Sequence, residues 1–281
     1  MRKYSEFDLW LRVTLFFAIC VAVIFFFQVI AIPLARTMLN NGNPLPLLIE
    51  VNLVRSMNGI VGVGLVYVFL KFDRRALNVV GFEWDKKLGF EWILLSIPIT
   101  LAGLIPTVVV ELLFGVVEFP QLLDPVGIAL TLVVTIFFIG LGEEILFRGY
   151  IQNVVETRYS FALGALVSAF FFGFLHLLLM TPSQSVNNMI AVSVSAFVIG
   201  LTLSYIYRIS NYNLILPTVI HGLWDFFLFI GSAEFFYEDL FKVMMEIVAS
   251  TLGALTIFAV VYIYFTRRLL PMQQTSESAM E

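Results

Sequence analysis

A small group of acidic, basic and imidazole side chains stands out within the long apolar stretches of this sequence. It comprises Glu143, Glu144, Arg148, His176, His221 and Asp225. Both histidines of the chain belong to this group. Carboxylates and imidazoles can take a proton from water and return it to a leaving group, which is the chemistry of hydrolysis. The residue types therefore point to a hydrolytic site, provided that the fold brings them together.

The spacing of the first residues predicts a division of roles. Glu144 and Arg148 form an acid-to-base pair four residues apart, so we expect Arg148 to keep Glu144 ionised and oriented. Glu143 points about 100° away from Glu144 on a helix and is the predicted general base. We expect His176 to share or relay the proton of the captured water.

The elements that position these residues are membrane helices. Hydrophobic residues make up 60% and charged residues 13% of the 281 residues, and the mean hydropathy is +0.97. A chain with so little polar surface cannot cover a soluble core, which excludes a water-soluble fold. Apolar runs long enough to span a membrane recur along the chain. They cover residues 12–34, 52–71, 92–117, 127–150, 160–181, 188–207, 212–231 and 240–266.

We therefore predict an all-α fold, a polytopic bundle of about eight transmembrane helices that forms one integral-membrane domain over residues 1–281. Residues 127–231 carry the candidate site, and residues 272–281 form a polar C-terminal tail. With the N-terminus inside, only Arg36, Arg55 and Lys242 of the 16 basic residues fall on the outer side. Because cytoplasmic loops carry the excess of Lys and Arg, both termini are expected to be cytoplasmic.

The order of the helices predicts that the candidate residues meet. Glu143 and His176 are equally far, about 24 Å, from a helical turn near residues 159–160. His221 lies about 15 Å beyond the next cytoplasmic turn, at residues 210–211, and a modest protrusion of the first hairpin brings all three to one depth. Asp225 lies one helical turn from His221 and shares its face.

The remaining ionisable groups receive simpler interpretations. Glu111 and Glu246 lie near the outer ends of their spans, and we interpret both as carboxylates near the interface without a function. Cys20 is the only cysteine, which excludes an internal disulfide. A net charge of −4 without a basic face argues against nucleic-acid binding.

Three motifs in this order resemble a known family. Glu143-Glu144-x-x-x-Arg148, Phe172-x-x-x-His176 and His221-x-x-x-Asp225 are similar to the motifs of the CPBP intramembrane proteases, the group that includes the type II CAAX prenyl endopeptidases. The resemblance implies an eight-helix membrane bundle that hydrolyses a peptide bond in a cavity open to the cytoplasmic side. In the eukaryotic-type members the products are the last three residues of a prenylated CAAX protein.

The resemblance also assigns roles to individual residues. It implies that Glu143 activates water with the help of His176, and that His221 and residue 225 stabilise the oxyanion. Some members have Asn at the last motif position, whereas this chain has Asp225. An ionised Asp225 accepts hydrogen bonds only, so we expect it to hold His221 in the form that donates to the oxyanion.

Several alternatives stay open at this stage. We expect no cofactor and a glutamate mechanism, with a zinc ion held by Glu143, His176 and His221 as the alternative. Zinc would occupy the predicted base, and no H-E-x-x-H pair is present. A proton-coupled transporter and a non-catalytic immunity or scaffold protein are the alternative functions. The expected partners are membrane lipids and a peptide or lipidated C-terminal protein substrate.

Overall fold

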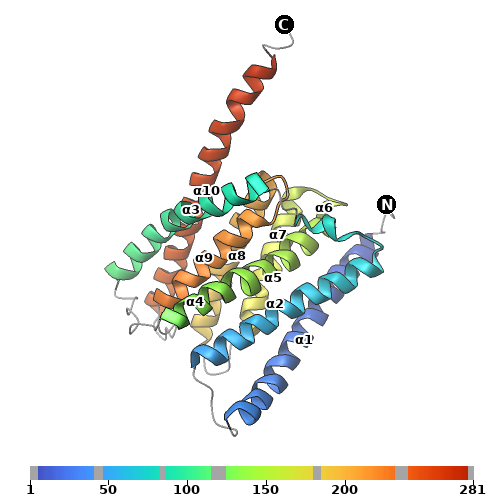
Figure 1. Cartoon of the computed structure of the whole chain (residues 1–281), viewed down its shortest axis with the longest axis vertical. Helices are drawn as coiled ribbons and strands as arrows, with labels where there is room; N and C mark the ends of the chain where they lie inside the picture. The colour runs from blue at the N-terminus through green and yellow to red at the C-terminus, as the bar shows by residue number, and fades with distance from the viewer. Residues whose placement is uncertain are drawn as a thin grey trace.

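The computed structural model describes residues 6–40, 47–82, 86–114, 125–179, 185–231 and 240–277, and its regular elements within these ranges are helices (Figure 1). Seven of the elements are single long helices. They are α1 (Glu6–Asn40), α2 (Leu47–Phe72), α3 (Lys86–Leu113), α7 (Phe161–Leu179), α8 (Val186–Ile209), α9 (Ile215–Gly231) and α10 (Leu240–Glu277).

A composite helix lies between α3 and α7 in the sequence. It passes without a break through α4 (Pro125–Val134), η2 (Thr135–Gly140), α5 (Leu141–Glu144), η3 (Ile145–Gln152) and α6 (Asn153–Glu156). The segments η2 and η3 are π-helical, with wider turns than an α-helix. The four residues of α5, which include Glu143 and Glu144, are thus bracketed by two π-helical segments.

The predicted all-α membrane bundle is confirmed. Within the described part of the chain, 7 helices are long and apolar enough to cross a membrane, and α9 is a shorter apolar helix. Several boundaries differ from those predicted. α10 continues to Glu277, so the sequence predicted as a polar tail at residues 272–281 begins as helix.

Both ends of the chain lie at the same end of the bundle (Figure 1). We call this the termini end; it carries the start of α1, the connection from α2 to α3, and the turns that precede α7 and α9. The short helix η1 (Leu77–Val80) is fastened there, because Tyr207 Oη donates to the Val80 carbonyl at 3.2 Å and Asn153 Nδ2 to the Val79 carbonyl at 2.8 Å. An Arg12–Asp73 ion pair joins α1 to the same connection.

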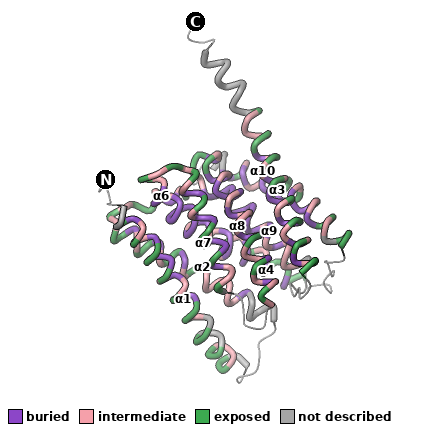
Figure 2. Tube along the Cα trace, turned by 180° about the vertical axis from the view of Figure 1, so that it is seen from behind, coloured by how far each residue is buried: buried purple, intermediate pink, exposed green. Residues whose placement is uncertain are grey.

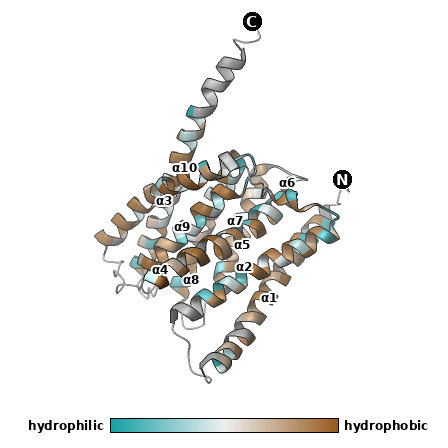
Figure 3. Ribbon diagram, in the orientation of Figure 1, coloured by the Kyte–Doolittle hydropathy of each residue, from teal (hydrophilic) through white to brown (hydrophobic). Residues whose placement is uncertain are grey.

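The core of the bundle is built around the composite helix. α7 packs along α8, α10 packs against α3 and α8, and α9 packs against η2 and α3. Buried residues concentrate on the central helices, whereas exposed residues are frequent on α1 and α3 (Figure 2). The outer helices are nevertheless largely apolar (Figure 3), and Phe26, Ile105 and Phe170 are all more than half exposed. Apolar side chains on the outer surface of the bundle are what a lipid environment requires.

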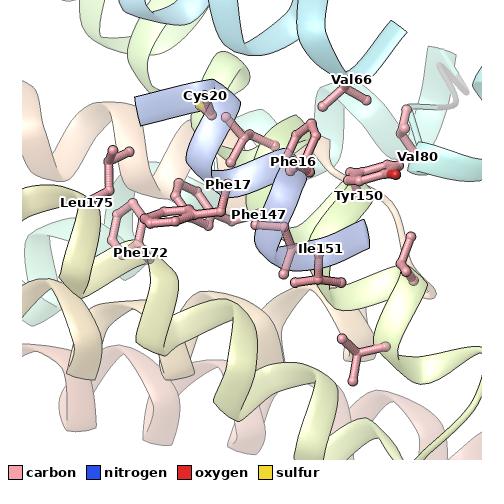
Figure 4. Close-up of a cluster of buried hydrophobic side chains, with 14 of the residues drawn as sticks. Phe16, Phe17, Cys20, Val66, Val80, Phe147, Tyr150, Ile151, Phe172 and Leu175 are labelled. Carbon is pink, nitrogen blue, oxygen red and sulfur yellow. The ribbon is translucent and has the colours of Figure 1, made fainter. Parts of the chain in front are cut away.

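An aromatic cluster attaches α1 to the composite helix. Phe16 and Phe17 of α1 lie beside Phe147, Tyr150 and Phe172 (Figure 4). The Phe16 and Tyr150 rings are 4.4 Å apart, and the Phe147 and Phe172 rings meet edge to face at 5.0 Å. The cluster therefore supports the segment of the composite helix that follows Glu143 and Glu144.

Two glycines allow α2 to approach the composite helix closely. A Cβ atom on Gly142 would lie 2.6 Å from the Gly59 Cα atom, and a Cβ atom on Gly59 would overlap the backbone of Phe138. Close backbone contact of this kind needs residues without side chains on both helices. The missing side chain of Gly142 thus allows α2 to lie directly against α5.

Candidate active site

Two adjacent carboxylates on α5 lie in different surroundings. The Glu143 side chain is 22% exposed, whereas that of Glu144 is fully buried. Glu143 lines a cavity of about 310 Å³, and its Oε2 atom makes no hydrogen bond to another described residue. Glu144 points away from this cavity lining and into the protein, as the 100° rotation between successive helical residues requires.

Glu144 is the centre of a buried network that we call the floor network: Glu144, Arg148, the Gly200 carbonyl and the Nδ1 atom of His221. Arg148 Nη1 donates to Glu144 Oε1 at 2.6 Å, as the four-residue spacing predicts. Arg148 Nη2 donates to the Gly200 carbonyl at 2.9 Å. His221 Nδ1 lies 2.9 Å from the same Glu144 oxygen. Because Glu144 Oε1 is the acceptor of the Arg148 bond, we assign Nδ1 of His221 as a second donor to the same oxygen.

The other nitrogen of His221 faces the cavity acids. Its Nε2 atom lies 3.8 Å from Glu143 Oε2 and 3.7 Å from Asp225 Oδ2, both too long for hydrogen bonds. The Asp225 side chain is 20% exposed, and the His221 side chain is only 3% exposed. These separations leave Nε2 available to a group that enters between the two carboxylates.

His176 reaches the cavity from α7. Its Nδ1 atom lies 2.9 Å from the Phe172 carbonyl, an acceptor, so Nδ1 carries the proton and Nε2 is left with a lone pair. The Phe172 ring contacts both imidazoles edge to face, with centroids 4.6 Å from His176 and 5.5 Å from His221. Arg148 lies over the same ring at 4.9 Å. Phe172 therefore spaces the two histidines and covers the floor network.

The structure brings all four predicted catalytic residues, Glu143, His176, His221 and Asp225, into the lining of one cavity. The two predicted orienting residues, Glu144 and Arg148, lie directly behind His221. The sequence did not show that His221 bonds to Glu144, because the two are 77 residues apart and no local pattern connects them.

Two cavity residues were interpreted differently from the sequence. Arg55, counted as a charge at the outer boundary, lines the cavity and stacks on the Phe229 ring at 3.2 Å. Glu246, interpreted as a carboxylate near the interface, is 5% exposed, lines the cavity and accepts a hydrogen bond from Ser250. The polar pair at 246 and 250, one turn apart in an apolar run, is the signal that could have revealed this site.

Two other expectations concern single residues. Cys20 is buried in the aromatic cluster of α1 (Figure 4) and is not one of the residues that line the cavity. The side chain of Glu111 lies outside the described part of the structure, so its interpretation stays a prediction.

A metal ion needs several side-chain ligands that converge on one point. Among the described residues, no group of three or more His, Cys, Asp or Glu side chains could hold a metal. Glu143, His176 and His221, the set considered for zinc, line one cavity without forming such a group.

The protein is thus a polytopic helical bundle that gathers carboxylates and imidazoles at one cavity between its helices. Residues 125–227 match the family model described as type II CAAX prenyl endopeptidase Rce1-like. The matched segment runs from α4 into α9 and contains all six candidate residues. The predicted resemblance is thus confirmed, and it supports assignment of this segment to a protease family. No curated protein sequence matches the chain.

Proposed function

We propose that the protein is an intramembrane endopeptidase in which Glu143 activates the hydrolytic water. One observation carries this proposal: the unbonded Oε2 of Glu143 lies 3.8 Å from the Nε2 of His221, and both residues line the same cavity. A reacting carbonyl beside this pair would have a base and a hydrogen-bond donor within reach. Both are requirements of peptide-bond hydrolysis without an acyl-enzyme intermediate.

In the proposed first step, Glu143 takes a proton from water while the water oxygen bonds to the carbonyl carbon. His176 Nε2 can accept a hydrogen bond from the same water and orient it, since Nδ1 is held by the Phe172 carbonyl. The carbonyl oxygen gains a negative charge, and protonated His221 donates to it through Nε2. Glu144 and Asp225 favour this protonated form, because both carboxylates lie within 4 Å of the His221 ring.

In the second step, the tetrahedral intermediate collapses and the carbon–nitrogen bond breaks. The proton held by Glu143 passes to the leaving nitrogen, so that Glu143 ends as a carboxylate ready for the next water. Throughout the cycle the floor network fixes Nδ1 of His221, and only Nε2 changes partner.

The test uses the purified full chain in lipid bilayers with two probes. One is a farnesylated CAAX peptide, the substrate class that the matched family description names, and the other is a library of unlipidated quenched-fluorescent peptides. Cleavage of either probe, with and without a chelator, measures substrate class and metal dependence together. Glu143→Gln should abolish cleavage.

Glu91→Gln is the matched control for this substitution. Glu91 is an α3 carboxylate that accepts a hydrogen bond from Tyr264 at 3.1 Å and is not part of the cavity lining. Gln can accept the same bond, so activity should stay at the wild-type level. Full activity of Glu143→Gln, or equal loss in both variants, would contradict the proposed mechanism.

A further inference from the structure

The cavity lies toward the end of the bundle opposite the termini end. His176 lies three residues before the last residue of α7, which begins at the termini end. Glu246 lies six residues, or about 9 Å, after the first residue of α10, which begins at the opposite end. Arg55 lies eight residues, or about 12 Å, after the first residue of α2, which also begins at the opposite end. Three separate helices thus place this part of the cavity lining toward the opposite end, and His221, six residues after the first residue of α9, lies at the deeper part of the cavity, closer to the termini end.

The protein is closed between the cavity and the termini end. Glu144, Arg148 and Gln152 follow one another along the composite helix toward the termini end, and each is fully buried. Phe147 and Tyr150 fill the same layer with exposed fractions of 0% and 1%. The floor network and this aromatic layer therefore separate the cavity from the termini end.

The distribution of the basic residues indicates which end of the bundle faces the cytoplasm. Arg148 lies inside the floor network and Arg55 in the cavity wall, so neither is a loop charge. Of the other Lys and Arg residues in the described ranges, only Arg36 and Lys242 belong to the end opposite the termini. An excess of loop Lys and Arg marks the cytoplasmic side, which identifies the termini end as cytoplasmic.

We propose that the cavity opens away from the cytoplasm and receives an extracytoplasmic, unlipidated peptide segment next to the membrane. This rests on the proposed endopeptidase function and replaces the cytoplasmic opening that the family resemblance implies. The charged residues Arg55 and Glu246 line the cavity. They suit the polar groups of a peptide, whereas an isoprenoid chain would remove water from both charges without replacing their hydrogen bonds.

The opening is tested by thiol labelling of the full chain in intact cells. The native Cys20 is buried, so the wild type serves as the blank. Val192→Cys places a thiol in the cavity lining on the first turns of α8, and Ser195→Cys places one deeper with almost no change in shape. Ser160→Cys, the same change at an exposed turn of the termini end, is the matched control.

A small charged thiol reagent that cannot cross membranes should label Val192→Cys or Ser195→Cys before permeabilisation. Ser160→Cys should be labelled only afterwards. The inference is overturned if the cavity thiols react only after permeabilisation, if they never react, or if the Ser160→Cys thiol reacts in intact cells.

The side of the membrane from which the substrate enters is tested in sealed proteoliposomes. The vesicles are sorted by whether the Ser160→Cys thiol is accessible from outside. The unlipidated peptide library, added outside, should be cleaved only by vesicles that expose the end opposite the termini, and Glu143→Gln should remove this cleavage. Glu143-dependent cleavage only in the other vesicles leaves the endopeptidase intact and overturns the inference. Absence of cleavage in both orientations and in detergent defeats the proposed function and its substrate, whereas the labelling still decides which way the cavity opens.

Discussion

The two sides of the His221 ring differ in how completely their charged groups are paired. On the Nδ1 side, Glu144 and Arg148 are fully buried and joined at 2.6 Å. On the Nε2 side, Glu143 and Asp225 are 22% and 20% exposed and remain 3.8 and 3.7 Å from the imidazole. Paired buried charges hold a geometry, whereas loosely placed charges at a cavity can respond to a ligand. One imidazole thus connects a fixed region with a reactive one.

The largest predicted effect is on the reactive side. Glu143→Gln keeps the shape of the side chain but cannot accept the proton of water. We expect kcat to fall by about 10²–10⁴-fold, the usual contribution of a general base. Thermal unfolding in detergent should stay near the wild-type midpoint, because Oε2 of Glu143 bonds to no other described residue.

The next effect tests the fixed side. Arg148→Met removes the guanidinium from the buried carboxylate of Glu144 and leaves it only the His221 bond, so the free energy of unfolding should fall by about 3–5 kcal/mol. Arg208→Met is the matched control, since Arg208 is exposed and stacks on the Phe161 ring at 4.4 Å. Equal unfolding midpoints for the two variants would show that the floor network does not hold the fold.

A third prediction tests the close packing of α2 against the composite helix, beside the cavity. Gly59→Ala would force α2 away from the Phe138 backbone, next to the cavity residue Ile139, and should cost about 1–3 kcal/mol of stability. Gly64→Ala, five residues along the same helix, meets nothing within 4 Å and should stabilise by about 0.5–1 kcal/mol. Thermal unfolding of the pair measures the difference, and equal midpoints would contradict the close contact.

The smallest predicted effect concerns Asp225. In Asp225→Asn the side chain loses its charge but gains a donor that can reach the oxyanion. We expect kcat/KM to change by no more than about tenfold, the value of one hydrogen bond. Asp225→Ala, which keeps neither function, should lose more activity than Asp225→Asn. The reverse order would place Asp225 outside the oxyanion site.

Much of this arrangement could be predicted from the sequence because it depends on the lengths of the apolar runs and on distances along the chain from the turns. Apolar runs of about 20 residues fix the spans, and equal distances from a turn fix equal depth in a hairpin. This reasoning placed Glu143, His176 and His221 at one level, and the structure brings them to one cavity. The pairing of Glu144 with Arg148 followed from helical spacing alone.

Other features depend on contacts that the sequence does not encode locally. The π-helical turns of η2 and η3 differ from α-helical turns by one hydrogen-bond step, and an apolar pattern does not distinguish them. Arg55 and Glu246 were interpreted as charges at the membrane boundary because both lie near the ends of their spans. The sequence does not say which neighbouring helix each side chain faces, so their place in the cavity lining could not be predicted. The bond from His221 to Glu144 likewise requires the packing of α9 against α5.

The two π-helical segments have a consequence for how this site can be gained or lost. Each π-turn accommodates one more residue than an α-turn, so deletion of a residue from η2 would let it relax to α-helix. Because the π-turn takes up its extra residue within the turn, this deletion leaves Glu143 directed toward the cavity, whereas a deletion from the α-helical segment α4 would rotate everything that follows by about 100°. Relatives that differ by one residue between Thr135 and Gly140 can therefore keep the glutamate at the cavity, whereas a one-residue change within α4 should remove catalysis even where every motif residue is kept.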